Sequence, residues 1–491
     1  MLLKQIIKSS NISQINMNEE LANDLVACYN YLYQCCKELV SMGKDAKPIR
    51  KIRISNFGAL GEVSLRLDRP LQIMIGPQAS GKSTLGKTIY FCRKIRDYLT
   101  EYAREIWNSP ELNDPYTGFL KFLRNPFMGC FGTTKHMDPF VIQYVYDDIN
   151  GKNVTIKLGR ANYVDFRFSE KLRDEIIHLL NEAASIAKAQ TGGLAEDFYA
   201  HRTYMSLFQQ QVRKLFADDE TLLYIPAGRN LLATIPDLIL PETTTNSISR
   251  AVDISQIDLI TQDFIHYIQQ MRGRFGSKLD EITQTYLKTV KGEIRNRDVE
   301  LACELIKDIL KGEYVNDKDG EKLYYNKDSW IKLMFGSSGQ QEVLWALNCV
   351  FLAILQNDKT FLVFEEPESH IFPDSQEVIA QLVALMINST NSDVFLTTHS
   401  PYMLTAINLL IFSGKIEKGS NDSIIERRFR LRPSEVDAYL IPKSKAKFVH
   451  LVSQNDDLID AEKIDSVSEQ INRKMDALLM QEIRQNEEKR R

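Results

Sequence analysis

The stretch LQIMIGPQASGKSTLGK, residues 71–87, predicts a central strand followed by a phosphate-binding loop. Residues 71–75 form a short apolar run between Pro70 and Gly76, as expected of a buried parallel strand. From Gly76 the sequence reads G-x-x-x-x-G-K-S and then enters a helix. Glycines let the backbone curl so that successive N–H groups point inward at oxyanions. The spacing indicates a nucleotide site, and the alternative is a glycine-rich strand–helix turn that binds nothing.

Two side chains of this loop have the chemistry that nucleotide phosphates require. Lys82 is long enough to reach the β- and γ-phosphates, and the Ser83 hydroxyl is suited to ligate Mg²⁺. The positive N-terminal end of the following helix adds to anion binding. The expected cofactor-binding residues of the loop are Gly76, Pro77, Gln78, Ala79, Ser80, Gly81, Lys82, Ser83 and Thr84.

The composition of the 491-residue chain is that of an ordinary globular protein, with 44% hydrophobic and 26% charged residues. Its length allows about two to four domains. A formal net charge of −4 gives no global basic field that would demand nucleic acid. Seven cysteines without C-x-x-C spacing indicate a reducing compartment, with neither disulfides nor a zinc site. Without a signal peptide or a run of about 18 apolar residues, the chain is expected in the cytoplasm and not in a membrane.

Changes in hydrophobic pattern divide the chain into five expected parts. Apolar spacing predicts helices at 20–42, 83–102, 168–190 and 197–218. Alternation over 49–70 predicts two antiparallel strands, and Asn150–Gly151 predicts a hairpin turn. The parts are an N-terminal helical segment (1–48), a first lobe with the phosphate loop (49–167), a helical insertion with a strand at 222–229 (168–312), a second lobe with three further motifs (313–412), and C-terminal strands with an amphipathic helix (413–491).

The second lobe carries three further motifs with polar groups at the ends of apolar elements. LMFGSSGQQEVLWAL places residues 337–340, a small and hydroxyl-bearing turn that ends in a glutamine, at the start of an apolar helix, where N–H groups and hydroxyls can face a phosphate. FLVFEEPESHIFP ends an apolar strand in Glu365 and Glu366, and DVFLTTHSPYML ends another strand just before His399. Because open α/β sheets place ligands at the carboxyl ends of their strands, these side chains are candidates for one site.

Four motifs follow one another along the chain: G-x4-G-K-S, S-S-G-Q-Q, strand-E-E-P-E and strand-T-H-S. Their order resembles that of the ABC-type ATPase superfamily, which has a Walker A loop, a signature motif, a Walker B strand with a catalytic glutamate, and a switch histidine. SSGQQ, EEPESHIFP and THSPYML resemble more narrowly the ABC/OLD-like ATPases of the RecF and Rad50 kind. They resemble most of all the ATPase subunits of bacterial phage-defence systems such as Septu, PARIS or Gabija. The resemblance covers about residues 50–165 and 325–412. It implies an α/β fold: an ABC-type P-loop ATPase head, a mixed sheet with flanking helices, with the helical insertion between Walker A and the signature motif.

This resemblance implies ATP and Mg²⁺ as cofactors and a role for each motif residue. Lys82 would hold the β- and γ-phosphates, while Ser83 and Glu365 would hold Mg²⁺ directly or through water. Glu366 would polarise the attacking water as general base, and His399 would contact the γ-phosphate. The expected catalytic residues are Lys82, Glu366 and His399.

The signature residues are expected to act across a dimer. Ser338 and Gly339 would close over ATP bound to a second copy, which implies a homodimer or a higher even oligomer. Gln340 is also expected among the cofactor-binding residues. Gln143 is the candidate for the Q-loop glutamine of the family, and Phe372 stands where relatives often have a second histidine.

Two arginine features have both a functional and a structural interpretation. Arg229, in YIPAGRN, either faces phosphate in the dimer or is a salt-bridged surface arginine. The second feature is a set of four arginines that alternate on an expected strand. These arginines either contact nucleic-acid phosphate or form a solvated strand face. This set is Arg427, Arg428, Arg430 and Arg432.

Two functions remain open. The first is an ATP-driven dimeric switch in an antiphage defence complex, which controls a separate effector such as a nuclease encoded nearby. The alternative is a RecF- or Rad50-like DNA-repair or recombination ATPase that binds DNA. The long insertion disfavours a third function, the nucleotide-binding subunit of a membrane transporter. The residues after His399 lack the acidic strand-end pattern of an OLD-type nuclease, so the effector is expected to be a partner that docks on the insertion or the C-terminal helix.

Overall fold

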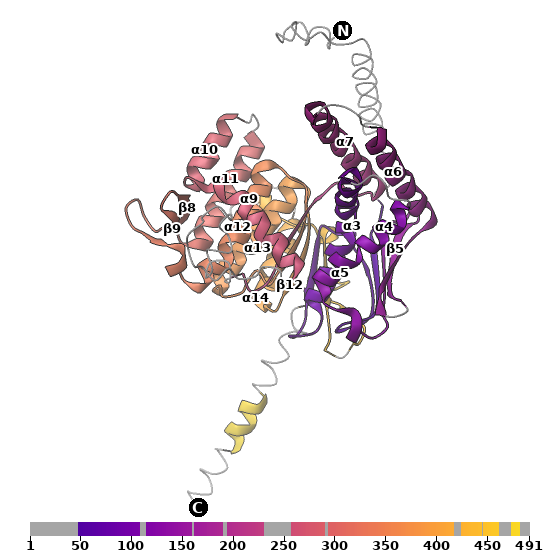
Figure 1. Cartoon of the computed structure of the whole chain (residues 1–491). Helices are drawn as coiled ribbons and strands as arrows, with labels where there is room; N and C mark the ends of the chain where they lie inside the picture. The colour runs from indigo at the N-terminus through magenta and orange to yellow at the C-terminus, as the bar shows by residue number, and fades with distance from the viewer. Residues whose placement is uncertain are drawn as a thin grey trace, which may run out of the picture. The chain divides into compact units, whose positions relative to one another are not determined.

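The computed structural model describes residues 48–108, 114–159, 162–189, 194–229, 257–289, 293–416, 424–443, 445–460 and 473–481 of the chain. The helix expected at 20–42 lies outside these residues, and so does the part of the expected C-terminal helix at 461–472. Strands and helices are mixed, with sheets flanked by helices, so the expected α/β class is confirmed. Figure 1 shows helices α3 to α7 on one side of the central strands and α9 to α14 on the other.

The Walker A strand lies inside a six-stranded sheet of order β14-β13-β3-β12-β11-β7. These strands are β3 (Leu71–Ile75), β7 (Thr221–Ile225), β11 (Thr360–Glu365), β12 (Asp393–Thr398), β13 (Val436–Leu440) and β14 (Val449–His450). β3 is buried along its whole length and pairs in parallel with β12 and β13, as expected for residues 71–75. β11 pairs in parallel with β12 and β7, so the carboxyl ends of five strands meet at one edge.

A second sheet, of order β2-β1-β4-β5-β6, is antiparallel throughout. Its strands are β1 (Lys51–Phe57), β2 (Leu60–Arg66), β4 (Val141–Asp147), β5 (Lys152–Leu158) and β6 (Val164–Phe168). The strand pair expected over 49–70 is β1 and β2. The turn expected at Asn150–Gly151 joins β4 to β5, and Gly151 adopts φ 67°, a conformation that glycine takes without strain.

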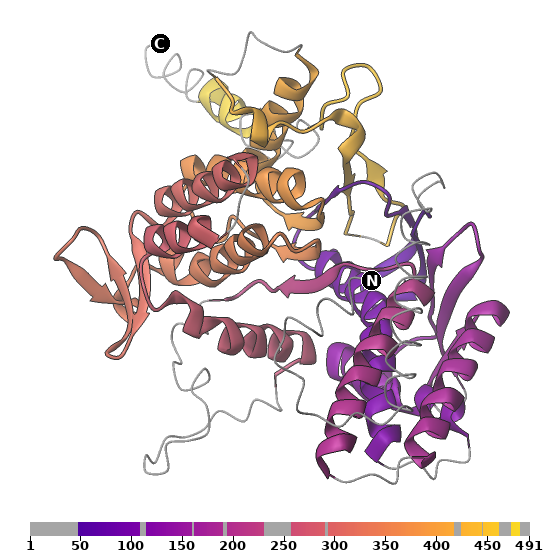
Figure 2. The same ribbon diagram turned by 90° about the horizontal axis from the view of Figure 1, so that it is seen from above.

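Helices cover both faces of the central sheet (Figure 2). On one side are α3 (Lys82–Asn108), α4 (Pro115–Phe122), α5 (Arg124–Phe131), α6 (Glu170–Ala189) and α7 (Leu194–Leu215), and on the other α9 (Leu259–Arg272), α10 (Leu279–Thr289), α11 (Glu293–Leu310), α12 (Ser338–Gln356), α13 (Pro373–Thr390) and α14 (Pro401–Lys415). Short 3-10 helices are η1 (Thr134–His136), η5 (Gly273–Phe275), η6 (Leu333–Phe335), η7 (Arg427–Phe429) and η8 (Pro433–Glu435). Alternation along the strands explains the layering: in β11, Leu362 and Phe364 enter one hydrophobic cluster and Phe361 and Val363 the other.

The segment 168–312, expected as a helical insertion, also supplies part of the central sheet. Its strand β7 pairs with the Walker B strand β11. Helices α6 and α7 contact α3, whereas α11 packs against α12 and α13. A small separate sheet, formed by β8 (Glu313–Asp317), β9 (Gly320–Tyr324) and β10 (Trp330–Lys332), then leads into the signature motif.

A buried ion cluster fastens α3 to the segment that enters β7. Arg93 Nε donates to Asp218 Oδ2 at 2.8 Å, and the same guanidinium bonds Glu220. Arg96 donates to the Asp218 carbonyl at 2.6 Å, and Arg50 to the neighbouring backbone at 2.9 Å. All five side chains are buried, and all three arginines lie within 3.5 Å of the Asp218 carboxylate. The cluster therefore ties the Walker A helix to the strand beside Walker B.

Removing one acid from this cluster is expected to destabilise the fold. Asp218→Asn leaves buried arginine charge uncompensated, and breaking a buried ion pair in this way costs about 3–5 kcal/mol. Burial opposes the charge, yet Arg93 and Arg50 hold the pKa of Asp218 well below its ordinary value. Because the pKa of Asp218 is lower in the folded state than in the unfolded chain, its carboxylate stabilises the fold at pH values above the ordinary carboxyl pKa, about 4. This stabilisation is lost as the pH falls below that value.

Urea denaturation followed by circular dichroism measures both effects. The Asp218→Asn variant is expected to have a lower midpoint at pH 7 and a smaller further loss between about pH 4 and pH 2. An unchanged midpoint at pH 7 would contradict a structural role for the cluster.

Candidate nucleotide-binding site

The Walker A loop is a tight turn without space for larger side chains. A Cβ atom on Gly76 would lie 2.4 Å from the Ile441 carbonyl oxygen, so only glycine fits there. Gly81 adopts φ +100° and Ala79 φ 60°, both in the left-handed region. The Ser80 hydroxyl is buried and has no hydrogen-bond partner among the described residues. The loop thus curls around a polar interior, as the glycine spacing predicts.

Lys82 lies within this curl. Its Nζ donates to the carbonyl oxygens of Gly76 at 2.9 Å and Pro77 at 3.1 Å. Burial lowers the pKa of Lys82, and the nearby charge of Glu366 opposes that shift. Ser83 is exposed on the first turn of α3. The ammonium and the hydroxyl are therefore placed where phosphate oxygens and a hydrated cation can reach them.

Glu365 ends the Walker B strand with both carboxylate oxygens engaged. Tyr224 donates its hydroxyl to Oε1 at 2.7 Å, and the Ala227 N–H donates to Oε2 at 3.0 Å. The side chain is only 4% exposed, so these donors replace the water that a carboxylate needs. Neither donor was expected from the sequence, because both come from β7 and the loop after it. Their bonds fix Glu365 in one orientation.

Glu366 and His399 are brought together, as the order of the motifs predicts. Glu366 Oε1 lies 3.1 Å from His399 Nε2. The hydrogen bond from His399 holds the pKa of Glu366 below its ordinary value, so the carboxylate is charged at neutral pH. The backbone of Glu366 adopts φ 42°, and its N–H donates to the Thr397 carbonyl at 2.9 Å. This unusual backbone turns the side chain away from the strand and toward the histidine.

Glu368, the last acid of EEPE, is a site residue that has no assigned role in the motif pattern of the sequence. Its Oε1 accepts hydrogen bonds from the Thr398 hydroxyl and from the His399 N–H, each at 2.7 Å. Its Oε2 is buried and has no hydrogen-bond partner in the described residues. Its charge also acts on Lys82. The carboxylate thus holds the backbone of the switch histidine beside the Walker A lysine.

The signature motif opens α12 with a complete capping box. The Ser337 hydroxyl accepts from the Gln340 N–H, and the Gln340 side chain accepts from the Ser337 N–H. Gln340 also donates to the Leu310 carbonyl at 2.8 Å, so its amide is engaged within its own chain. A Cβ on Gly339 would lie 2.5 Å from the His370 carbonyl oxygen, which explains the glycine. Ser338 is exposed beside it.

Arg229 is salt-bridged, as one of the two interpretations from the sequence expected, but it is not on the surface. The side chain is 1% exposed, so it faces neither solvent nor a phosphate. It bonds the backbone carbonyls of Glu365 and Glu366 and pairs with Glu342 on α12.

The arginines at 427–432 do not form a strand. Residues 427–429 are the 3-10 helix η7. Arg428 pairs with Asp298, and Arg432 pairs with Glu435, so the charges of these two arginines are locally neutralised.

Two residues singled out from the family pattern lie in the antiparallel sheet and directly before α13. Gln143 is in β4 of the antiparallel sheet, opposite Arg53 and Thr155. Phe372 precedes α13 and is 76% exposed.

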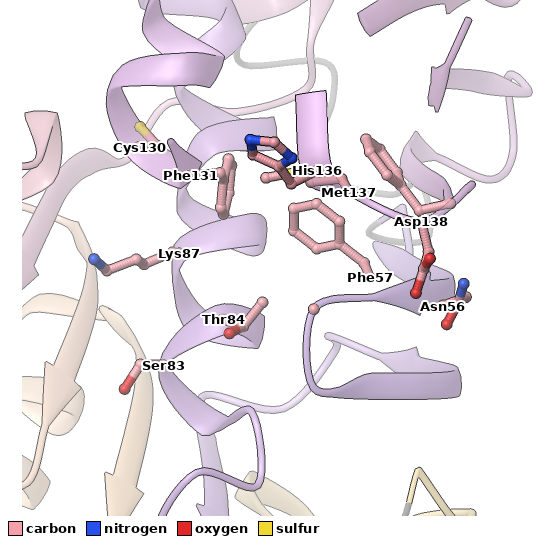
Figure 3. Close-up of a pocket in the computed structure, with 12 residues that line it drawn as sticks. Asn56, Phe57, Ser83, Thr84, Lys87, Cys130, Phe131, His136, Met137 and Asp138 are labelled. Carbon is pink, nitrogen blue, oxygen red and sulfur yellow. The ribbon is translucent and has the colours of Figure 1, made fainter. Parts of the chain in front are cut away.

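A cavity of about 430 Å³ opens beside the first turn of α3 (Figure 3). Ser83 and Thr84 form one wall. Three aromatic side chains form another: Phe57 packs against Phe131 at 5.1 Å and against Phe140 at 4.7 Å between ring centroids. The cavity therefore combines the end of the Walker A loop with an apolar, aromatic surface.

Residues 223–404 match the family model described as "AAA ATPase domain". The match begins in β7 and ends in α14, so it includes the signature motif, Walker B and the switch histidine but not the Walker A loop. Comparison with curated proteins gives no match.

Three solved structures of SMC heads align with most of the chain at low identity. A head bound to the C-winged helix domain of ScpA is 12% identical with a TM-score of 0.37, covering 83% of this chain and 98% of the other. The head from Thermotoga maritima is 10% identical (TM-score 0.32, 73% and 92% covered), and the Pyrococcus furiosus head bound to the ScpA C-terminal domain is 14% identical (TM-score 0.33, 87% and 99% covered). TM-scores this low do not establish a shared fold. No described helix is long and apolar enough to cross a membrane.

Removing the Glu368 carboxylate is expected to slow nucleotide turnover without weakening nucleotide binding. Glu368→Ala frees the Thr398 hydroxyl and the His399 N–H, and the loss of a charge-assisted hydrogen bond corresponds to about a 10- to 100-fold lower kcat. Glu368→Gln keeps one acceptor oxygen and should be intermediate. Phosphate release gives kcat, and a fluorescent ATP analogue gives affinity. Glu377→Ala, an exposed glutamate on α13, is the matched control, and a normal kcat in Glu368→Ala would contradict this role.

Proposed function

We propose that the chain binds and hydrolyses ATP and works as a dimeric switch. The observation that carries this proposal is the Glu366–His399 pair, 3.1 Å apart, at the carboxyl ends of two adjacent parallel strands. Lys82 is close enough for the charge of Glu366 to act on its pKa. A charged carboxylate, an imidazole and a phosphate-binding lysine are the groups that water attack on a γ-phosphate requires.

The nucleotide would lie along the first turn of α3. Its phosphates would sit against the loop 76–81, where Lys82 exchanges its carbonyl partners for phosphate oxygens. The base and ribose would occupy the cavity lined by Phe57 and Thr84. An aromatic wall suits a planar base, and the size suits a nucleoside.

The residues present fit a magnesium ion held mainly by phosphate. Ser83 offers an exposed hydroxyl at the loop. Glu365 keeps a second lone pair on each oxygen, but its bonds to Tyr224 and Ala227 leave it better suited to bind through water. When bound, Mg²⁺ would neutralise phosphate charge. In this arrangement Glu366 accepts a hydrogen bond from the attacking water and orients it, and His399 donates toward the γ-phosphate.

The dimer completes the site. Ser338 and Gly339 are exposed or half-exposed on the first turn of α12, whose N–H groups and positive end suit a phosphate. We propose that they close over ATP on a second copy, giving a homodimer or a higher even oligomer. Gln340 would act indirectly, by capping this helix.

We further propose that the dimer is the cytoplasmic ATPase subunit of an antiphage defence complex and controls a separate effector such as a nuclease. The support is the resemblance of SSGQQ, EEPESHIFP and THSPYML to such subunits. The second candidate is a DNA-repair ATPase of the RecF or Rad50 kind. The net charge of −4 and the paired Arg428 and Arg432 favour the first candidate, because strong DNA binding needs unpaired positive charge.

Glu366→Gln is expected to bind ATP, to lose turnover by about 10²- to 10⁴-fold, and to accumulate a dimer, because the general base is lost while phosphate contacts remain.

Lys82→Ala should lose ATP affinity and stay monomeric. Ser338→Arg should bind ATP and fail to dimerise, because bulk and charge block closure. Light scattering with and without ATP measures assembly. Ser185→Arg, an exposed helical serine on α6, is the control, and normal turnover in Ser338→Arg would exclude a signature role in trans.

The chain alone is expected to hydrolyse ATP but not to cut nucleic acid. The test incubates it with Mg²⁺ or Mn²⁺, ATP, and plasmid or RNA. Asp456 and Asp457, adjacent acids in the segment after β14, are the carboxylates to replace. Cleavage that persists in Lys82→Ala and disappears when both are replaced by alanine would show a nuclease centre in this chain and remove the need for a separate effector.

A further inference from the structure

Arg229 is a buried arginine that bonds three separate parts of the site. Its NH1 donates to the carbonyls of Pro226 at 2.9 Å and Glu365 at 2.6 Å, and its NH2 donates to the Glu366 carbonyl at 3.1 Å. Its Nε donates to the Glu342 carbonyl at 3.1 Å. Its own N–H donates to Glu342 Oε1 at 2.8 Å. One guanidinium thus joins the loop after β7, the end of Walker B, and α12.

Burying a charged arginine in this position costs free energy, which argues that Arg229 has a specific role. Burial lowers the pKa of Arg229, and the charge of Glu342 opposes that shift. Glu342 is itself only 1% exposed, and its carboxylate lies 3.7 Å from Arg229 Nε. A buried ion pair contributes little net stability compared with apolar packing. What it supplies, and apolar packing does not, is a fixed geometry between the groups that it bonds.

The bond to the Glu366 carbonyl fixes an unfavourable backbone. A non-glycine residue at φ 42° persists only where its surroundings hold it, and Glu366 is held at both ends. Its N–H is bonded to the Thr397 carbonyl, and its carbonyl is bonded to Arg229. Because the backbone sets the direction of the side chain, Arg229 controls where the Glu366 carboxylate points.

The bond to Glu342 connects this backbone to the signature helix. Glu342 lies four residues after Ser338 on α12, close to one helical turn. A displacement of the helix N-terminus therefore moves Glu342, and through Arg229 it moves the carbonyl of Glu366.

We propose that Arg229 is a positioning residue that couples the two ATP sites of the dimer. The inference rests on the proposed function. In the dimer, α12 of one protomer touches the nucleotide of its partner, while Glu366 of the same protomer acts on its own nucleotide. Arg229 links these two groups within one chain, so engagement of the partner's ATP aligns the carboxylate at the protomer's own site.

The test compares two single variants, Arg229→Lys and Glu342→Gln, with a third, Arg93→Lys. Arg93 is also buried and ion-paired, so Arg93→Lys is the matched control. Lysine cannot reproduce the planar fork of donors, and the Glu342→Gln change keeps the side-chain shape but removes the charge. Phosphate release is titrated with ATP. The wild type is expected to show a Hill coefficient above 1. Arg229→Lys and Glu342→Gln should each reduce the Hill coefficient to 1 and lower kcat by about tenfold, which is within the usual range of coupling between sites. Arg93→Lys should lower only the unfolding midpoint.

A second measurement does not depend on turnover. In the nucleotide-free chain, amide hydrogen exchange at Glu366 is expected to be about tenfold faster in Glu342→Gln than in Arg93→Lys, because the carbonyl anchor is loosened. Unchanged exchange would overturn the positioning role, and an unchanged Hill coefficient would overturn the coupling. Absence of ATP hydrolysis in the wild type would instead overturn the proposed function, which keeps the two failures distinct.

Discussion

The parallel pairing of β12 with both β3 and β11 is the constraint on which the site depends. Pairing in this direction places the ends of three strands at one edge of the sheet. The Walker A loop, the Walker B acids and the switch histidine each follow one of these strands directly. The register of the sheet therefore determines the spacing of these three motifs along its edge.

Around this edge, buried polar groups are held by partners from distant parts of the chain. Tyr224 and Ala227 bind Glu365, the Thr398 hydroxyl and the His399 N–H bind Glu368, and Glu342 binds Arg229. In a desolvated site each such bond is both a stabilising contact and a restriction on orientation. The strand β7 is central to this arrangement, because it brings Tyr224 and the loop that carries Arg229 next to Walker B.

The sequence predicts the parts of the site that are encoded locally. A glycine spacing, an apolar run or a capping serine has its physical effect within a few residues, so the Walker A turn, the buried strands and the start of α12 can be recognised. Arg229 could not be placed in this way, because Glu342 and Glu366 lie 113 and 137 positions away. Glu368 was visible in EEPE, but its partners lie on another strand. The alternation of arginines at 427–432 predicts a strand. In the structure, residues 427–429 instead form a 3-10 helix in which Arg428 pairs with Asp298.

The position of β3 also has a consequence for how the chain is made. Its two neighbours in the sheet, β12 and β13, begin at residues 393 and 436, whereas β3 ends at residue 75. A ribosome adds about 5–20 residues per second, so the apolar LQIMI segment waits on the order of tens of seconds for either neighbour. During that interval its backbone groups lack the partners of the finished sheet. Nascent chains of this protein should therefore depend on ribosome-associated chaperones more than their size suggests, and slow synthesis should favour aggregation over assembly.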